Sequence, residues 1–431
     1  MTEKRNEYMD KVLGYVRNKE AKRFVEEELH YHLDQESINL KDSGLDEQVA
    51  EDQAIHLMGS AERLGLEMNK LHRPRVDWTM IGLVLVISMI GILPTLHISE
   101  ELYNDNGFLV RKIVFLMIGA VISLSLMFFD YRKLHILKWW IYGFTALVLI
   151  SLTFFPNTTV NGAAYFRMES FTIDSTATVT LLVLSWIIFL GTTKTNFWVV
   201  TLLFIGSLYP LMIIPSLPAV FVFTLTITVL LWLVYKNKRK HIILGYTGSA
   251  LIIAIMMINL NIKPYQFERI FALIHPEEYK STTGYMYLRN HDLLARGGWI
   301  GEAGGNEVIT EPHTNFAFTT ITYHYGWIVG GVLIITGLFI MYRMIRNIQS
   351  IKDPFGRVII IGGVTLFSTQ FLYNIGMILG FLPLTGMSLP FVSYGLNPTL
   401  QTSLVIGLFL SVYRRKNLVS VQAFENVQSK N

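Results

Sequence analysis

Ten apolar stretches, each roughly long enough to cross a lipid bilayer as a helix, follow one another along most of this chain. A bilayer offers the backbone no hydrogen-bond partners, so a series of such stretches folds as helices that satisfy their own polar groups. Hydrophobic residues make up 52% of the chain and charged residues only 16%, with a mean hydropathy of +0.41. The sequence therefore predicts an all-α, polytopic membrane protein with about ten transmembrane helices, at 79–97, 112–129, 137–155, 177–191, 196–213, 218–235, 241–260, 316–342, 357–380 and 398–413.

The first 77 residues differ from the rest in composition and predict a small soluble helical domain. Roughly half of the acidic residues lie there, and two amphipathic runs, 8–33 and 49–58, are separated by Ser43-Gly44. This segment resembles the short helical prefix found ahead of some bacterial permease-type membrane proteins. We divide the chain into a prefix domain at 1–77, a membrane domain at 78–416 and a tail at 417–431.

The basic residues predict the orientation of the spans. Lysine and arginine cluster in loops that all lie on one side if the first span runs from inside to outside, which makes the N- and C-termini cytoplasmic. The clusters lie at 73–75, 132–138, 236–240, 343–357 and 414–416. The same orientation places the 156–176, 261–315 and 381–397 loops outside. A net charge of only +4 gives no indication of nucleic-acid binding, and the absence of cysteine excludes disulfides and thiolate chemistry.

The long 261–315 loop carries more chemistry than a membrane anchor needs. It contains Gly284-Tyr285, the run Arg296-Gly297-Gly298-Trp299-Ile300-Gly301, and Glu311-Pro312-His313-Thr314-Asn315-Phe316. A second unusual segment, 383–395, contains Pro383-Leu384-Thr385-Gly386 and ends Ser393-Tyr394-Gly395. In the predicted topology both segments lie on the outer face.

These two segments, in this order on a ten-span scaffold, resemble the SEDS family of the RodA, FtsW and SpoVE type. The resemblance covers roughly 78–416. It implies peptidoglycan glycan polymerisation outside a bacterial cell membrane, from lipid II, an undecaprenyl-pyrophosphate-linked precursor, beside a class B penicillin-binding transpeptidase. It also implies a role in cell shape or cell division.

The resemblance and the loop chemistry together select the candidate site residues. A pyrophosphate leaving group needs cationic or amide donors, and the acceptor hydroxyl needs a base or a divalent cation held by carboxylates. The expected cofactor is thus a divalent cation, Mg²⁺ or Mn²⁺, with Glu311 as its ligand or as the base. The catalytic candidates are Glu311, His313 and Asn315, and the substrate-binding candidates are Arg269, Tyr285, Arg296, Gly297, Gly298, Thr314, Ser393 and Tyr394.

Asn315 stands where the family motif has an aspartate, and an amide cannot take a proton. This departure opens two alternatives to polymerisation: a non-catalytic lipid II-binding or regulatory protein, and a transporter of lipid-linked precursors. Several candidates also have simpler interpretations. Thr314 suits a helix N-cap, and Gln370 and Asn374, four residues apart on one helix face, suit hydrogen bonds between helices better than a lipid path.

Overall fold

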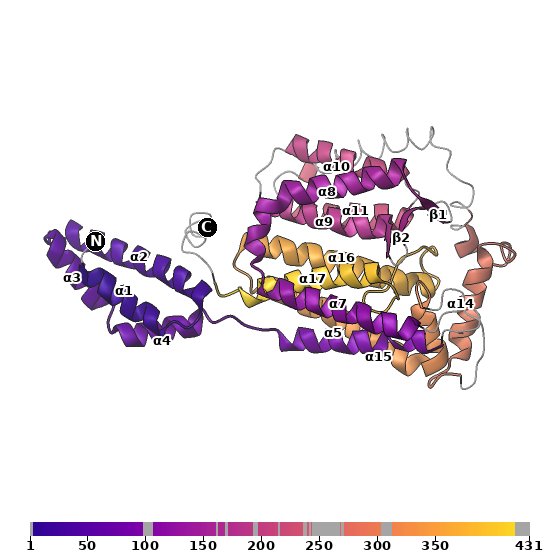
Figure 1. The fold of residues 1–431 in the computed structure, drawn as a ribbon, viewed down its shortest axis with the longest axis horizontal. Helices are drawn as coiled ribbons and strands as arrows, with labels where there is room; N and C mark the ends of the chain where they lie inside the picture. Colours follow the sequence, from indigo (N-terminus) through magenta and orange to yellow (C-terminus); the bar gives the residue numbers. More distant parts are fainter. Residues whose placement is uncertain are drawn as a thin grey trace. The chain divides into compact units, whose positions relative to one another are not determined.

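The fold is taken from a computed structural model of the chain (Figure 1). It describes residues 3–97, 107–160, 163–168, 171–192, 197–213, 216–235, 239–240, 243, 268, 271–302 and 313–418. These residues form two compact units. The first, here called the prefix unit, contains the prefix residues up to Asp77 together with 349–357 and the residues from Val412 onward. The second, the membrane unit, contains 78–348 and 358–411.

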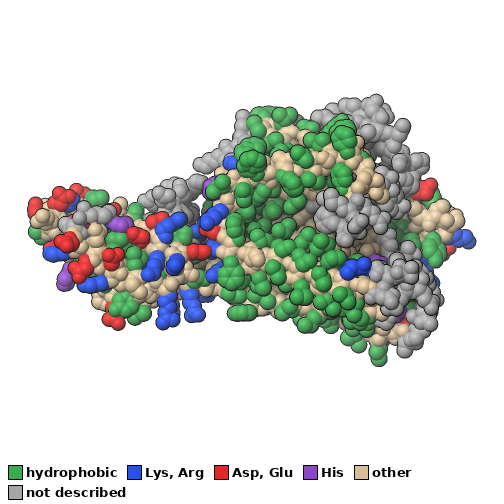
Figure 2. Space-filling model, in the orientation of Figure 1, with side chains coloured by type: hydrophobic (Ala, Val, Ile, Leu, Met, Phe, Trp, Pro, Cys, Tyr) green, Lys and Arg blue, Asp and Glu red, His purple; other side chains and the backbone are tan. Residues whose placement is uncertain are grey.

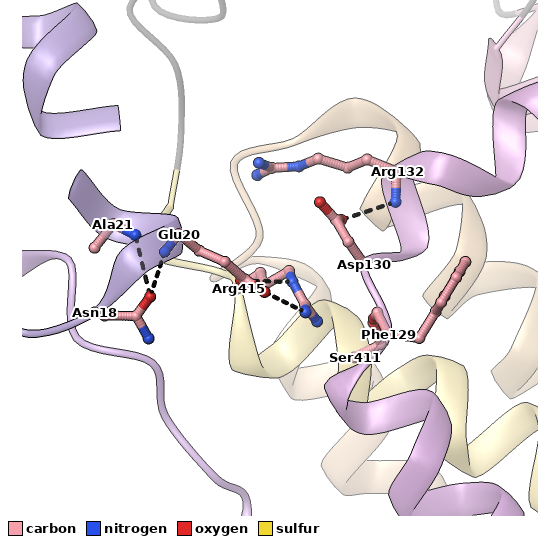
Figure 3. Close-up of polar contacts among 8 residues, drawn as sticks. All are labelled: Asn18, Glu20, Ala21, Phe129, Asp130, Arg132, Ser411 and Arg415. Atoms are coloured by element: carbon pink, nitrogen blue, oxygen red, sulfur yellow. Dashed lines mark hydrogen bonds and ion pairs between the residues drawn. The ribbon is translucent and has the colours of Figure 1, made fainter. Parts of the chain in front are cut away.

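The prefix unit is built on four amphipathic helices, α1 (Glu3–Tyr15), α2 (Lys19–Asp42), α3 (Glu47–Leu57) and α4 (Ala61–Leu71). Asn18 caps α2, because its Oδ1 accepts from the backbone N–H groups of Glu20 at 2.8 Å and Ala21 at 3.1 Å (Figure 3). The apolar stripes of α1 and α2 meet in a core that also includes a residue from the other end of the chain. Its members are Val12, Val16, Ala21, Phe24, Val25, Leu29 and Leu418.

The membrane unit is a bundle of long apolar helices (Figure 1), and the face of it seen in Figure 2 is largely hydrophobic. On α7, Val110, Met117 and Val121 are each more than 60% exposed along one face, as expected for contact with lipid. The main helices are α5 (Trp78–Ile90), α7 (Phe108–Phe128), α8 (Leu134–Phe154), α9 (Ser175–Thr192), α10 (Phe197–Ile213), α11 (Leu217–Val234), α15 (Ala317–Ile348), α16 (Pro354–Ile378) and α17 (Leu396–Arg414).

Within the described residues, five segments are long and apolar enough to cross a membrane, and α9, α10 and α11 are shorter apolar helices. The five are Trp78–Leu96, Phe108–Phe128, Tyr131–Phe154, Ala317–Ile348 and Pro354–Ile378. The membrane-protein fold predicted from the apolar stretches is thereby confirmed. The predicted span at 241–260 lies, apart from Ile243, outside the described residues.

Two elements were not anticipated from the sequence. The helix α14 (Gly284–Arg296) occupies part of the long loop, and a small antiparallel sheet forms in the 156–176 loop. Its strands are β1 (Thr158–Val160), β2 (Ala163–Met168) and β3 (Phe171–Asp174), rich in the β-branched and aromatic residues that favour strands. The bundle is helical, as predicted, and the sheet is an addition to one of its loops.

The helix α15 is also not continuous. Gly326 has φ 80° and ψ 171°, which breaks the helical ladder. The two N–H groups that follow bond to another segment: Trp327 donates to the Gly298 carbonyl at 2.9 Å and Ile328 to the Trp299 carbonyl at 3.2 Å. The break thus docks the 297–301 glycine run against α15. His324 lies just before this break, and its ring meets that of Tyr323 edge to face, with 4.8 Å between centroids and 75° between the ring planes.

Candidate functional site

Two segments that the sequence singled out separately lie against each other. We call residues 313–316 and 389–395 together the motif pair. The Ser393 hydroxyl donates to the Thr314 carbonyl at 2.7 Å and accepts from the Leu389 N–H, also at 2.7 Å. The Tyr394 N–H donates to the His313 carbonyl at 2.6 Å. Four predicted site residues, His313, Thr314, Ser393 and Tyr394, are therefore brought together by backbone and hydroxyl hydrogen bonds.

Asn374 of α16 supports the motif pair from within the bundle. Its side chain is fully buried, and Nδ2 donates to the Asn315 carbonyl at 3.2 Å and to the Met387 carbonyl at 2.6 Å. One turn earlier, the Gln370 amide donates to Gln401 of α17 at 3.3 Å. This second bond is the interhelical hydrogen bond that the four-residue spacing favours. Asn374 instead fixes the backbone carbonyl of Asn315. Asn315 itself is half-buried.

Lys112 of α7 fixes the second half of the motif pair. Its side chain has no exposed surface, and Nζ donates to three consecutive carbonyls, those of Phe391 at 2.9 Å, Val392 at 3.0 Å and Ser393 at 2.9 Å. Phe391 has φ 62°, a conformation that a bulky L-residue adopts only when its surroundings enforce it. The lysine therefore stabilises a turn that the backbone alone would not favour.

Arg111 and three rings complete the cluster. The ring of His313 lies 5.1 Å from that of Phe108 and 5.2 Å from that of Tyr394, centroid to centroid. Arg111 Nε donates to the Tyr394 hydroxyl at 3.1 Å, and its guanidinium carbon lies 5.2 Å from the Phe108 ring centroid. Arg111 is exposed while Lys112 is buried, so the N-terminal turn of α7 offers one outward cation beside the motif pair.

The environment of His313 determines its charge. Burial, and secondarily the positive charge of Lys112, lower the pKa of His313 to about 4. The imidazole is therefore neutral near pH 7 and does not act as a cation toward a phosphate. It remains a hydrogen-bonding group whose position is set by Phe108 and Tyr394.

The remaining described candidates lie on α14 and in the glycine run that follows it. Arg296 pairs with Glu302 at 3.0 Å and approaches Asp292 at 3.7 Å, while Tyr285 is 52% exposed. Gly297 and Gly301 lie directly against the Thr322 and His324 carbonyls of α15, where a Cβ atom would collide with backbone. These glycines serve close packing at the α15 break, and Gly298 adopts φ 51° there. Besides the carboxylates of Glu302 and Asp292, Arg296 contacts Tyr323 of α15, whose ring centroid lies 5.7 Å from the guanidinium carbon.

Glu311 and Arg269 lie outside the described residues, so the structure does not place them. Within the ranges that it does place, no group of three or more His, Asp or Glu side chains is arranged to hold a metal ion. Asn315 and His313 do not make up a divalent-cation site by themselves, because neither supplies the carboxylate oxygens that Mg²⁺ prefers.

Sequence reasoning missed Arg111, Lys112 and Phe108. A basic pair at the start of an apolar stretch usually marks the end of a span, and the predicted span at 112–129 begins within this pair. The available signal was that a charged pair at this position is predicted to face outside, against the trend that places basic residues on the cytoplasmic side.

The chain was compared with known proteins. Residues 74–418 match the family described as cell cycle proteins of the FtsW, RodA and SpoVE type. A probable peptidoglycan glycosyltransferase FtsW of Geobacter metallireducens is 26% identical over 366 residues, 79% of this chain and 92% of that protein. The FtsW of Trichlorobacter lovleyi is 24% identical over 359 residues, 78% of this chain and 90% of that protein.

Solved structures show the same fold. A chain from a structure described as "Structural coordination of polymerization and crosslinking by a peptidoglycan synthase complex" superposes with a TM-score of 0.64 at 24% identity, covering 79% of this chain and 98% of that one. The rod shape determining protein RodA of Thermus thermophilus gives a TM-score of 0.56 at 20% identity, covering 79% and 97%. The family match begins at residue 74, so it leaves out nearly all of the prefix domain. The chain is a member of the FtsW/RodA/SpoVE family with an additional N-terminal helical domain.

Proposed function

We propose that this protein polymerises glycan strands from lipid II at the membrane surface, as a peptidoglycan glycosyltransferase. The observation that carries the proposal is the motif pair joined to Arg111 and Lys112. Relatives that align with nearly four fifths of the chain are named peptidoglycan glycosyltransferases, which supports the same assignment.

The chemistry of the cluster suits a pyrophosphate-linked donor. An arginine presents a planar fork of N–H donors that binds phosphate oxygens in pairs. Arg111 is oriented by Tyr394 and Phe108 at the N-terminal turn of α7, where helix N–H groups also favour anions. Arg111 would hold the leaving group while Lys112 keeps the supporting turn rigid.

Deprotonation of the acceptor hydroxyl is the step that the described residues support least. His313, with a pKa lowered to about 4, is a weak base, and Asn315 has no proton-accepting group. Glu311 is the carboxylate that we propose for this step, either as the base or as the ligand of a divalent cation.

Polymerisation of purified lipid II, followed by gel separation of the strands, tests the proposal. We expect wild-type protein to form strands, Glu311→Gln to form none, and Arg111→Gln to be at least tenfold slower, since about 1.4 kcal/mol of transition-state stabilisation is a factor of ten. Arg346→Gln, at an exposed arginine near the C-terminal end of α15, is the matched control and should retain wild-type activity. An inactive wild type, assayed with Mg²⁺ or Mn²⁺ and with its transpeptidase partner, would refute the proposal.

A non-catalytic lipid II-binding role is the second candidate, and Asn315 favours it. In that case wild-type protein binds lipid II without forming strands. Asn315→Asp then discriminates between the two roles, because it returns a carboxylate at a position whose backbone is already held by Asn374. Strand formation by Asn315→Asp but not by wild-type protein would show that the wild-type site lacks only the carboxylate at position 315. Strand formation by wild-type protein at the same rate as by Asn315→Asp would exclude the non-catalytic role.

We also propose that both termini are cytoplasmic and that the partner is a class B penicillin-binding transpeptidase. The distribution of basic loops supports the orientation. Since the natural chain has no cysteine, single cysteines at Ser281 and Asp42, both exposed, report it directly. A membrane-impermeant maleimide applied to intact cells should label Ser281→Cys and leave Asp42→Cys unlabelled. The opposite labelling pattern would show that the termini lie outside the cell.

A further inference from the structure

The glycine run at 297–301 carries two large apolar side chains that the protein does not cover. Trp299 is 76% exposed and Ile300 is 84% exposed. The close approach of Gly297 and Gly301 to α15 explains the glycines of the run, but it does not require an apolar side chain at 299 or 300. Neighbouring exposed apolar side chains of this size mark a contact with a membrane or with another molecule. We call Trp299 and Ile300 together the tip.

The backbone of the tip is fixed to α15. Besides the two bonds at the break described above, the Glu302 N–H donates to the Tyr323 carbonyl at 2.8 Å. The packing is equally close in both directions, because a Cβ atom on Gly301 or on Gly326 would come within 2.2 Å of a backbone oxygen of the facing segment. The position of the tip along the membrane unit is therefore set by the position of the break in α15.

The surroundings of α15 change at the same break. All of residues 317–323 are buried by other parts of the protein. From Ile328 onward, one face of the helix is open, with apolar side chains at intervals of three or four residues that are each 45% exposed or more. They are Ile328, Val332, Ile335, Leu338, Phe339, Tyr342 and Ile345. Such a stripe on a transmembrane helix faces lipid. The tip continues this stripe, because the Ile328 N–H donates to the Trp299 carbonyl.

The break also lies at the level of one membrane surface. Arg343 is the first lysine or arginine of α15. A hydrocarbon core of about 30 Å takes about 20 helical residues, so a span counted back from Arg343 reaches Tyr323. Tyr325 and Trp327 stand close to this level, and tyrosine and tryptophan are enriched where membrane and water meet. The motif pair lies on this side of the membrane, since its residues 313–316 directly precede α15.

We propose that the tip is a lipid anchor: Trp299 and Ile300 insert between the phospholipids of the leaflet next to the motif pair, at the boundary between headgroups and acyl chains. The indole of tryptophan suits this boundary because it combines an apolar ring with an N–H donor. The ion pair of Arg296 and Glu302, which flanks the glycine run, supplies charge at the headgroup level. The anchor goes beyond the proposed function, since it concerns phospholipids and no reacting group.

Depth-dependent fluorescence quenching tests the anchor. The natural chain has no cysteine, so Ile300→Cys in the full-length protein can be labelled with a nitrobenzoxadiazole fluorophore and reconstituted in vesicles of phosphatidylethanolamine and phosphatidylglycerol. Phospholipids that carry a nitroxide near the top of the acyl chain should reduce the emission about twofold or more, and a nitroxide near the middle of the chain should have a weaker effect.

Two control positions calibrate the depth. Ile335→Cys, about 10 Å further along α15 than Ile328, should be quenched most strongly by the nitroxide in the middle of the chain. Ser281→Cys is exposed beside the exposed, charged Lys280 and should be quenched only by a water-soluble nitroxide. Trp299→Cys is a second tip position, in case Ile300→Cys does not fold, and should give the same result as Ile300→Cys.

Tip labels that are quenched like the Ser281→Cys label would overturn the anchor. Tip labels that neither the lipid nitroxides nor the water-soluble one can quench would also overturn it, because a second copy or another protein segment would then cover the tip. The measurement needs no lipid II, so an inactive wild type would refute the proposed function and leave this result unaffected.

Discussion

A lysine with no exposed surface has to find hydrogen-bond acceptors inside the protein, and Lys112 finds three carbonyl oxygens in a row. The arrangement links a helix near the start of the membrane unit to a turn almost 280 residues later. It also compensates for the left-handed backbone of Phe391. At the scale of single residues, the motif pair is therefore supported by a side chain that lies outside both motifs.

Replacement of Lys112 by methionine should destabilise the protein by roughly 2 kcal/mol or more, since buried carbonyls that lose their donors cost about 1–3 kcal/mol each. Thermal unfolding in detergent, followed by intrinsic fluorescence, measures the change. Lys133→Met, at an exposed lysine, is the control and should leave the unfolding temperature nearly unchanged. A Lys112→Met protein as stable as wild type would show that the turn at 391–393 is stable without the lysine.

The sequence singled out several residues that the structure brings together, because their signal is local. Ser393, Tyr394, His313 and Thr314 stand in short motifs, and hydrogen bonds do unite them. Arg111 carries no such signal, because its role follows from Tyr394, a residue 283 positions away. Arg296 has a clear sequence signal but pairs with Glu302 in a separate cluster, a pairing that composition alone does not reveal.

At the scale of elements, the break in α15 allows the glycine-rich segment 297–301 to pack against that helix. The apolar stretch at 316–342 predicted one uninterrupted span, because hydropathy does not register backbone angles. Gly326 releases two N–H groups from the helical ladder, and the carbonyls of Gly298 and Trp299 accept from them. The glycine run thus has a packing partner that explains its composition.

Gly326→Ala should destabilise the membrane unit by roughly 2 kcal/mol, because φ near 80° strains any L-residue and the new Cβ would meet the Trp299 carbonyl. Gly331→Ala, five residues later on the same helix, meets no atom within 4 Å and should change stability by less than about 1 kcal/mol. Thermal unfolding of the two variants side by side checks this difference. Equal stability would mean that the break is not enforced by packing.

At the scale of the whole molecule, the sequence predicted the segments but not their grouping. The apolar stretches located the spans, and the amphipathic runs located the prefix helices. The assignment of 349–357 and 412–418 to the prefix unit could not be predicted, because it depends on partners such as Glu20 and Arg415, 395 positions apart. The boundary at residue 416 therefore divides 412–418, a segment that belongs as a whole to the prefix unit.

The prefix unit should lose stability in acid. Hydrogen bonding to His72, opposed by burial and aided by the charges of His72, His32 and Lys352, lowers the pKa of Glu28 below 4.5. A carboxyl whose folded-state pKa is depressed stabilises the fold above its unfolded value, and this contribution is lost as the pH falls through the folded value. Hydrogen exchange of α2 should therefore accelerate below about pH 4.5 in wild type, more than in Glu28→Gln. Glu26→Gln should keep the wild-type profile.

Leu418 in the prefix core also orders events during synthesis. Residues 1–77 leave the ribosome before Leu418 does, so the packing of Leu418 with Val12, Phe24 and Leu29 can form only after the last span has been made. Domains usually fold as units during translation. A product that stops before Leu418 therefore has a prefix core that lacks one of its seven buried apolar residues.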